Sequence, residues 1–325
     1  MKLFAFLFPI FGFVLRGLYG WVGNYGVAVI LLTLITRILM LPMSVKQQKS
    51  TAKMQRLQSK VRKIQQQYAG DQRKIQEETQ ALYSREGTNP MSMGCLPLLL
   101  QLPIIYGLIG VIYYPLQYVL QIPAESITAL STALSSEAVK PHLAADVLTA
   151  ISGKSSDRMI EFYIIESIDK IRQFAPNAVS ADVFTKIENL DFNFLGLSLG
   201  QVPNIKHPDL LWSVPILSFL SQMASSVVMY LRQKQQNPEM SKNPSMGCMT
   251  FGMPLMSLWF TFQFPVGIGV YWITSSVIAF VQMMALNYFY SPKKTTAKLL
   301  IEETVQRRSR EQNLKRVAER KNTQD

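Results

Sequence analysis

The stretch GNYGVAVILLTLITRILMLPM, residues 23–43, decides the fold. From Tyr25 to Leu41 almost every side chain is apolar or small, and the run is long enough to cross a bilayer, which takes about 20 apolar residues. The one charge in the run is Arg37. A guanidinium inside hydrocarbon costs roughly 2.5–3.5 kcal/mol on insertion scales, and it does not lose its proton to avoid that cost. The stretch therefore predicts a membrane span that holds Arg37 in a polar setting.

The neighbours of Arg37 along the helix favour a functional role for its charge. Thr33 lies one helical turn before Arg37 and Ser44 two turns after it, so the three share a face. Lys46 follows Arg37 by nine residues, about 13 Å along a helix, which places Arg37 within the span rather than at its edge. The alternative is an anchor whose charge snorkels to the headgroups. Polar faces on other predicted spans favour a hydrated cavity over that alternative.

The composition is typical of a membrane protein with several spans. Of the 325 residues 48% are hydrophobic and 17% are charged, and the charges cluster between long uncharged runs. The two cysteines, Cys95 and Cys248, give no disulfide framework, and two histidines make a His/Cys metal site improbable. The chain has no P-loop motif, so nucleotide binding is not expected. We expect no cofactor.

Four more apolar runs predict four more spans. No charge occurs between Glu86 and Glu125, and the uncharged run 243–292 is long enough for two spans with a break at Phe264-Pro265-Val266-Gly267. A signal peptide is the alternative to an interfacial helix at the start, but no small-residue cleavage site follows it. The predicted order is an interfacial helix at 1–22, spans at 23–43, 91–113, 210–231, 247–263 and 267–290, and connections at 44–90, 114–209, 232–246 and 291–325.

Polar side chains recur on these further spans. Gln101 is the one strongly polar residue of the second span. Helical spacing places polar side chains on one face of the third span and on one face of the fifth. These residues are Ser218, Gln222 and Ser225 in the third span, and Tyr271, Ser275 and Gln282 in the fifth. Because unsatisfied polar groups are costly in hydrocarbon, the faces predict a shared hydrated interior.

The distribution of charge orients the chain in the membrane. Lys and Arg number ten in 44–90, three in 232–246 and ten in 291–325, so the positive-inside rule places these segments in the cytoplasm. With five spans, the N-terminus then lies outside and the C-terminus inside. The segment 114–209 has seven basic and eleven acidic residues and becomes an extracytoplasmic insert. Its clearest helical pattern is DRMIEFYIIESIDKIRQF, residues 157–174.

The basic segment 44–90 is predicted to be a cytoplasmic helical hairpin. Apolar residues recur in its first half at spacings of three and four, as in a coiled-coil seam, and Ala69-Gly70-Asp71 breaks the helix. A solvated cytoplasmic surface is one interpretation of its charges. The other is contact with the ribosome, its RNA or anionic lipid, in which Lys60, Arg62 and Lys63 take part and to which the basic tail 291–325 contributes.

Several stretches together resemble the YidC/Oxa/Alb family of membrane protein insertases. They are LLTLITRILMLP, the basic stretch KQQKSTAKMQRLQ, the span start NPMSMGCLPLLLQLPI and the last-span stretch FPVGIGVYW, and the resemblance covers 1–115 and 190–325. It implies an all-α polytopic membrane protein whose five transmembrane helices surround a hydrophilic groove open to the cytoplasm and to lipid. Family groove positions fall on Arg37, Thr33, Gln222 and Trp272, and polarity adds Gln101 and Tyr271.

The resemblance implies a function without catalysis. An insertase would pass short polar tails of nascent membrane proteins through the groove of a bacterial plasma membrane protein and release their apolar helices into lipid. Arg37 would pair transiently with a substrate carboxylate. The chain is expected to act as a monomer, and the cooperation of a Sec-type translocon stays open. Sixteen methionines suggest a surface for varied apolar helices, although packing filler is the alternative for most of them.

Other functions fit the pattern less well. A chaperone or scaffold that assembles membrane proteins with a Sec-type translocon is the closest alternative. An ion-coupled transporter normally has several intramembrane acids or histidines and repeated halves. An intramembrane protease needs a nucleophile with a base. The predicted spans contain no Asp, Glu or His, so we expect neither a transporter nor an enzyme.

Overall fold

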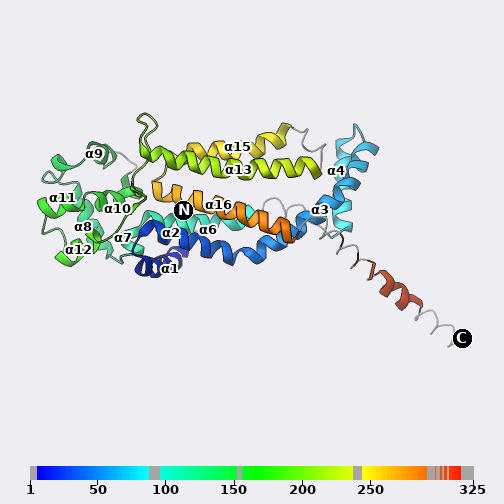
Figure 1. The fold of residues 1–325 in the computed structure, drawn as a ribbon, viewed down its shortest axis with the longest axis horizontal. Coiled ribbons are helices and arrows are strands. Elements are labelled where there is room, and N and C mark those ends of the chain that lie inside the picture. The colour runs from blue at the N-terminus through cyan, green and yellow to red at the C-terminus, as the bar shows by residue number, and fades with distance from the viewer. Residues whose placement is uncertain are drawn as a thin grey trace. The chain divides into compact units, whose positions relative to one another are not determined.

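The computed structural model describes residues 6–87, 96–151, 156–236, 244–290 and short pieces between 297 and 315 (Figure 1). Most of the described chain is helical. It forms two compact units, of which the first comprises Met1–Ile38 and Gln101–Phe280 and the second comprises Leu39–Leu100 and Val281–Asp325.

Long apolar runs form the principal helices of the first unit. The turn between its first two helices is defined by sequence: Gly23 has a left-handed φ of 69°, and the Asn24 side chain accepts a hydrogen bond from the Val27 amide at 3.1 Å. The helices that belong to this unit wholly or in part are α1 (Leu7–Val22), α2 (Tyr25–Leu39), α6 (Leu96–Tyr113), α13 (Ser213–Gln236), α15 (Pro244–Thr261) and α16 (Val266–Phe289).

Two helices in the described residues are long and apolar enough to cross a membrane. They are Leu210–Arg232 and Val266–Phe289, and the broken pair Tyr25–Leu39 and Leu41–Ser50 is a third candidate if it counts as one span. The prediction of a helical membrane protein is therefore supported at this level. The count of five spans and the predicted segment boundaries stay predictions.

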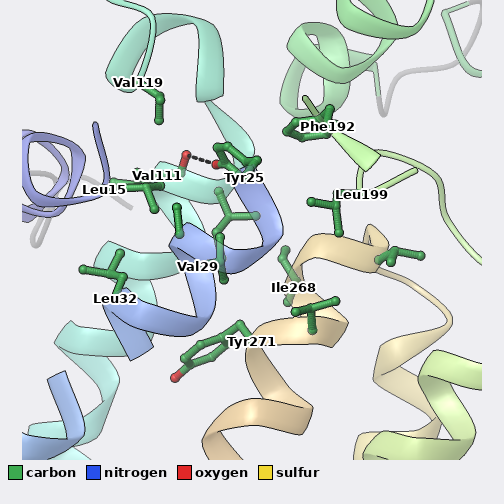
Figure 2. Close-up of a cluster of buried hydrophobic side chains, with 14 of the residues drawn as sticks. Leu15, Tyr25, Val29, Leu32, Val111, Val119, Phe192, Leu199, Ile268 and Tyr271 are labelled. Atoms are coloured by element: carbon green, nitrogen blue, oxygen red, sulfur yellow. Dashed lines mark hydrogen bonds between the residues drawn. The ribbon is translucent and has the colours of Figure 1, made fainter. Parts of the chain in front are cut away.

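One face of α2 packs into the main apolar core of the first unit (Figure 2). Tyr25, Val29 and Leu32 follow one another at helical spacing and are at most 2% exposed. The Tyr25 hydroxyl donates to the Val111 carbonyl of α6 at 3.4 Å, and Ile268 brings α16 into the same cluster. This packing fixes the rotation of α2 about its axis. It therefore also fixes the direction of the side chains on the other faces of the helix.

The helices α1 and α6 approach closely at two glycines. A Cβ atom at Gly107 would lie 2.6 Å from the ring of Phe11, and one at Gly110 would overlap the ring of Phe8. The two phenylalanine rings occupy the space that side chains would fill. A side chain at either glycine would force the phenylalanine ring or one of the helices to move.

A short segment ties the first turns of α2 and α16 together. It contains the antiparallel hairpin of β1 (Asn193–Phe194) and β2 (Leu197–Ser198). On one side, Asn24 donates to the Asp191 carboxylate at 2.7 Å. On the other, the Gly267 amide donates to the Leu199 carbonyl at 2.8 Å, which satisfies a free N–H of the α16 N-terminus. The segment thereby sets the spacing between the two helices.

The region between α6 and β1 builds a second apolar core within the first unit. The stretch 157–174, predicted as one helix, is divided at Ser167 (φ −108°, ψ 11°), which lies outside the helical region of backbone geometry. The elements are α7 (Pro115–Tyr118), α8 (Ala124–Leu134), η1 (Lys140–His142), α9 (Ala145–Ile151), α10 (Ser156–Glu166), α11 (Ile168–Phe174) and α12 (Ala181–Glu188), and η2 (Leu210–Trp212) precedes α13.

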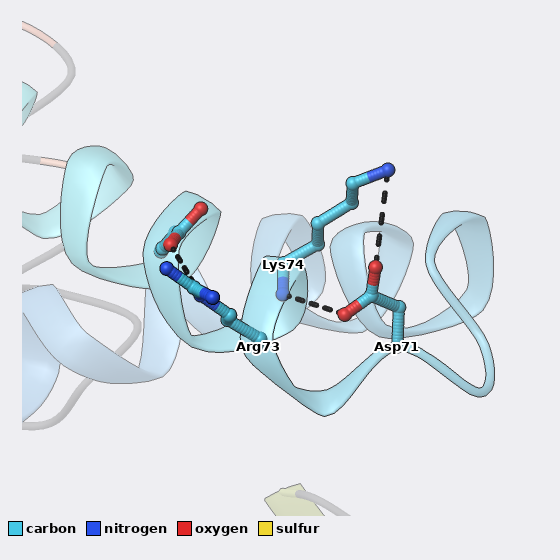
Figure 3. Close-up of polar contacts among 4 residues, drawn as sticks. Asp71, Arg73 and Lys74 are labelled. Atoms are coloured by element: carbon cyan, nitrogen blue, oxygen red, sulfur yellow. Dashed lines mark hydrogen bonds and ion pairs between the residues drawn. The ribbon is translucent and has the colours of Figure 1, made fainter.

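Two helices in contact, α3 (Leu41–Gln67) and α4 (Gln72–Arg85), make up most of the described second unit. Gly70, at φ 98°, allows the tight reversal between them. Asp71 caps α4 by accepting from the Lys74 amide at 3.1 Å, and Figure 3 shows this bond beside the 3.3 Å pair of Arg73 with Glu77. The chemistry of the turn thus accounts for the helical hairpin.

Candidate substrate-binding site

Arg37 extends from α2 to α16 within the first unit. Its guanidinium donates a hydrogen bond to the Ser275 hydroxyl. None of the described ion pairs involves Arg37, so its described partner is neutral. A cation held by a hydroxyl keeps its net charge, and that charge can attract an acidic group in a medium of low dielectric.

Thr33 stands on the same face of α2 but directs its hydroxyl into its own helix. The hydroxyl donates to the Val29 carbonyl at 2.7 Å, and the residue is 1% exposed. Thr36 behaves in the same way, donating to the Thr33 carbonyl at 2.8 Å. Both threonine hydroxyls make their hydrogen bonds within α2, which lowers the free-energy cost of a polar side chain in an apolar helix.

The buried face of α16 contributes the residues opposite Arg37. Tyr271 precedes Ser275 by one helical turn, and the two are 2% and 6% exposed. The Tyr271 ring belongs to the main core, and its hydroxyl points out of the cluster in Figure 2. Trp272 is half-buried and meets the edge of Phe264, with ring centroids 5.4 Å apart.

Gln222 makes a separate polar contact between α13 and α15. Its amide donates to the Ser218 hydroxyl of α13 at 3.2 Å and to the Ser257 hydroxyl of α15. Thr261 continues the polar row on α15 by donating to the Ser257 carbonyl at 2.7 Å. Figure 1 shows these two helices side by side. The hydrogen bond of Gln222 to Ser257 therefore links the two helices.

The structure thus brings some of the predicted site residues together and separates others. Arg37 of α2 meets Ser275 of α16, which lies one helical turn from Tyr271, and Thr33 lies one turn from Arg37 on α2. Gln222 belongs to the α13–α15 contact, and Trp272 to an aromatic pair. The side chain of Gln101 lies outside the described residues.

Sequence reasoning placed Ser275 on a polar face but did not identify it as the partner of Arg37, and it missed Ser257 altogether. The signal for Ser275 was its spacing of four from Tyr271, a buried polar pair on an apolar helix. Ser257 precedes Thr261 by one helical turn on α15, and this spacing was the signal that could have identified it. Both contacts join residues far apart in the sequence.

The predicted partner-binding residues of the second unit differ in their surroundings. Lys60 of α3 forms an ion pair with Glu86 at the end of α4, which joins the two helices of the hairpin. Arg62 is half-buried, while Lys63 is exposed. The surface charge is therefore smaller than the count of basic residues indicates, because Glu86 offsets Lys60.

One buried carboxylate lies in the region between α6 and β1. Glu161 of α10 is 1% exposed and accepts hydrogen bonds from the amides of Leu116, at 2.6 Å, and Gln117, at 3.3 Å. Burial raises the pKa of Glu161 from 4.5 to about 7, and the two amide bonds only partly oppose the effect. A search of the described residues finds no group of three His, Cys, Asp or Glu side chains arranged to hold a metal ion.

Comparison with known proteins assigns the chain to a family. It belongs to the 60Kd inner membrane protein family, whose model matches residues 17–294. The chain is thus a bacterial membrane protein of a family whose curated relatives carry the name membrane protein insertase YidC.

Three relatives of that name illustrate the range of similarity. The Fusobacterium nucleatum protein is 27% identical over 281 residues, which cover 86% of this chain and 93% of the relative. The Rickettsia felis protein is 26% identical over 282 residues, but the match covers 38% of that longer relative. The Syntrophus aciditrophicus protein is 40% identical over 103 residues, 32% of this chain and 19% of the relative.

Proposed function

We propose that this chain is a membrane protein insertase that moves short polar tails of nascent membrane proteins across the membrane and releases their apolar helices into lipid. The single observation that carries the proposal is the Arg37 guanidinium of an apolar helix, held by the neutral Ser275 hydroxyl rather than by a described acid. Membership of the insertase family supports it.

The physical problem for such a protein is the cost of polar groups in hydrocarbon. Each unsatisfied polar group costs several kcal/mol there, and a charged tail costs more. Arg37 offsets part of this cost for an acidic tail, since charge-assisted hydrogen bonds are roughly twice as strong as neutral ones. Partition of the apolar part of the substrate into lipid then favours completion without a nucleotide.

The groove itself is part of the proposal. We infer a bundle of five spans in which Arg37 and Trp272 line one part of a hydrophilic groove, supported by the buried side chains of Thr33 and Tyr271. Gln222 and Gln101 would contribute from the third and second spans. In this arrangement the hydrogen bond of Gln222 to Ser257 would open to admit substrate, because the Gln222 amide is engaged in the described state.

The proposed orientation places the hairpin of α3 and α4 in the cytoplasm and the second apolar core outside. The basic segments 44–90, 232–246 and 291–325 support this orientation through the positive-inside rule. The exposed cations of the hairpin are then available to anionic lipid, to ribosomal RNA or to a Sec-type partner.

Reconstitution tests the function directly. The purified protein is placed in liposomes with a small single-span substrate and no ATP, and protease protection reports the translocated tail. An insertase raises the protected fraction well above that of empty liposomes. Insertion that requires an added Sec-type translocon would favour the assembly scaffold, and failure with and without the translocon would contradict both functions.

A further inference from the structure

We infer that Ser275 is a positioning residue for Arg37: its hydroxyl fixes the guanidinium while leaving the positive charge uncompensated, which makes the site selective for acidic tails. The inference rests on the proposed insertase function. It adds to the site a residue that positions Arg37.

The first observation is geometric. Ser275 lies on the buried face of α16, is 6% exposed, and accepts a hydrogen bond from Arg37 of α2. Both helices are fixed at their first turns by the segment that contains Asn193 and Leu199. A long arginine side chain has considerable rotamer freedom, so an acceptor on a fixed neighbouring helix restricts its position.

The second observation is the chemical type of the acceptor. Among the described ion pairs none includes Arg37, and its described partner is a hydroxyl. A carboxylate at the position of Ser275 would hold the guanidinium more firmly, but it would neutralise it and compete with a substrate acid. The Ser275 hydroxyl orients the guanidinium without neutralising its positive charge.

The third observation is the number of donors that remain. A guanidinium has five N–H donors in a planar fork, and the bond to Ser275 uses one of them. The others can meet a carboxylate with two parallel bonds, which needs a fixed plane. Ser275 thus affects how well Arg37 recognises an acid, and this effect is separate from packing.

The test compares two substrates that differ only in the charge of the tail, one acidic and one neutral, at equal protein level in liposomes. Ser275→Ala is expected to lower the acidic-to-neutral insertion ratio roughly tenfold, the size of one charge-assisted hydrogen bond. Ser275→Thr, which keeps the hydroxyl, is expected to restore the ratio. Ser275→Asp is expected to lower the ratio further and to spare the neutral tail, because Arg37 is then neutralised.

A matched control separates positioning from packing. Ser221→Ala removes a hydroxyl whose 2.9 Å bond goes to the Ser218 carbonyl of its own helix, and it should leave the ratio unchanged. Unchanged ratios in both the Ala and the Asp variants of Ser275 would overturn the inference, even if the Ala variant is less abundant. Failure of the wild-type protein to insert either substrate would instead overturn the proposed function.

Discussion

Thr33 and Arg37 lie one helical turn apart on α2, but the structure uses their polar groups in different ways. The Thr33 hydroxyl donates to its own helix, whereas Arg37 reaches Ser275 on α16. Of these two side chains, the charged one has the higher cost in an apolar medium, and it is the one that makes a hydrogen bond to another helix. At the residue scale, we therefore expect substitutions in this helix to affect insertion through the charge they remove and not through the number of polar groups they remove.

The buried carboxyl of Glu161 gives a prediction about pH. Its pKa is raised in the folded protein, from 4.5 to about 7, so the folded state binds more protons than the unfolded state between these values. The contribution of Glu161 to stability should be greatest below pH 4.5, fall as the pH rises toward 7, and level off above it. The full effect is about 3 kcal/mol, since one pKa unit corresponds to 1.36 kcal/mol.

Thermal unfolding in detergent between pH 4 and 8.5 measures this dependence. Glu161→Gln keeps an acceptor for the Leu116 amide but cannot ionise, so its curve should lack the fall between pH 4.5 and 7. Glu166→Gln changes an exposed carboxyl of the same helix and should keep the wild-type slope. A Glu161→Gln curve parallel to that of wild type would show that this carboxyl is not responsible.

At the element scale, the contact between α13 and α15 should depend on Gln222 and Ser257 together. Hydrogen bonds between membrane helices contribute about 0.6 kcal/mol on average, so a double-mutant cycle of Gln222→Ala and Ser257→Ala should give a coupling of that order. Unfolding of the purified protein measures it. Additive losses would mean that the described hydrogen bond has no net effect on stability.

Charge reversal in the hairpin of α3 and α4 should leave the protein folded but should lower its insertion activity. Changing Lys60, Arg62 and Lys63 to Glu should reduce insertion in cells at normal protein level, because partner anions are then repelled. Glu86→Gln is the control, since it keeps the three cations and removes the exposed pair with Lys60, which contributes about 1 kcal/mol or less. Insertion by the triple variant at the wild-type rate would leave the hairpin without a role in partner binding.

At the scale of the whole molecule, the sequence predicted the class of protein better than its contacts. Hydrophobic runs and basic segments indicated a helical membrane protein, and motifs indicated the family that the comparison then confirmed. Periodicity shows which residues share a face of one helix, but it does not show which helix lies opposite. The contact of Arg37 with Ser275, 238 residues away, depends on that tertiary arrangement.

The same reasoning explains the other differences. Glu161 stands in an amphipathic pattern in which a carboxylate normally faces water, and only the fold shows that it meets the start of α7. The division of 157–174 at Ser167 was missed because serine is an ordinary residue within a helix pattern. Ser257 and Thr261 lie one helical turn apart, but this spacing does not show that Gln222 of α13 lies opposite.

The orientation in the membrane is testable on exposed positions. With Cys95 and Cys248 replaced, single cysteines at Gln66, Gln235 and Ser309 should react with a membrane-impermeant thiol reagent only after lysis. One at Ser135, in the region proposed to lie outside, should react in intact cells. The opposite pattern would reverse the proposed topology.

The most direct test of the account concerns the charge of Arg37. Insertion of the acidic-tailed and neutral-tailed substrates is measured for wild type, Arg37→Lys and Arg37→Ala at equal protein level. The Arg37→Lys variant is expected to retain substantial insertion activity. The Arg37→Ala variant is expected to lose activity mainly for the acidic-tailed substrate, because that tail gains most from pairing with the charge. Equal loss for both tails, or lowered abundance of the Ala variant, would contradict a role for the charge in substrate recognition and make Arg37 a structural anchor.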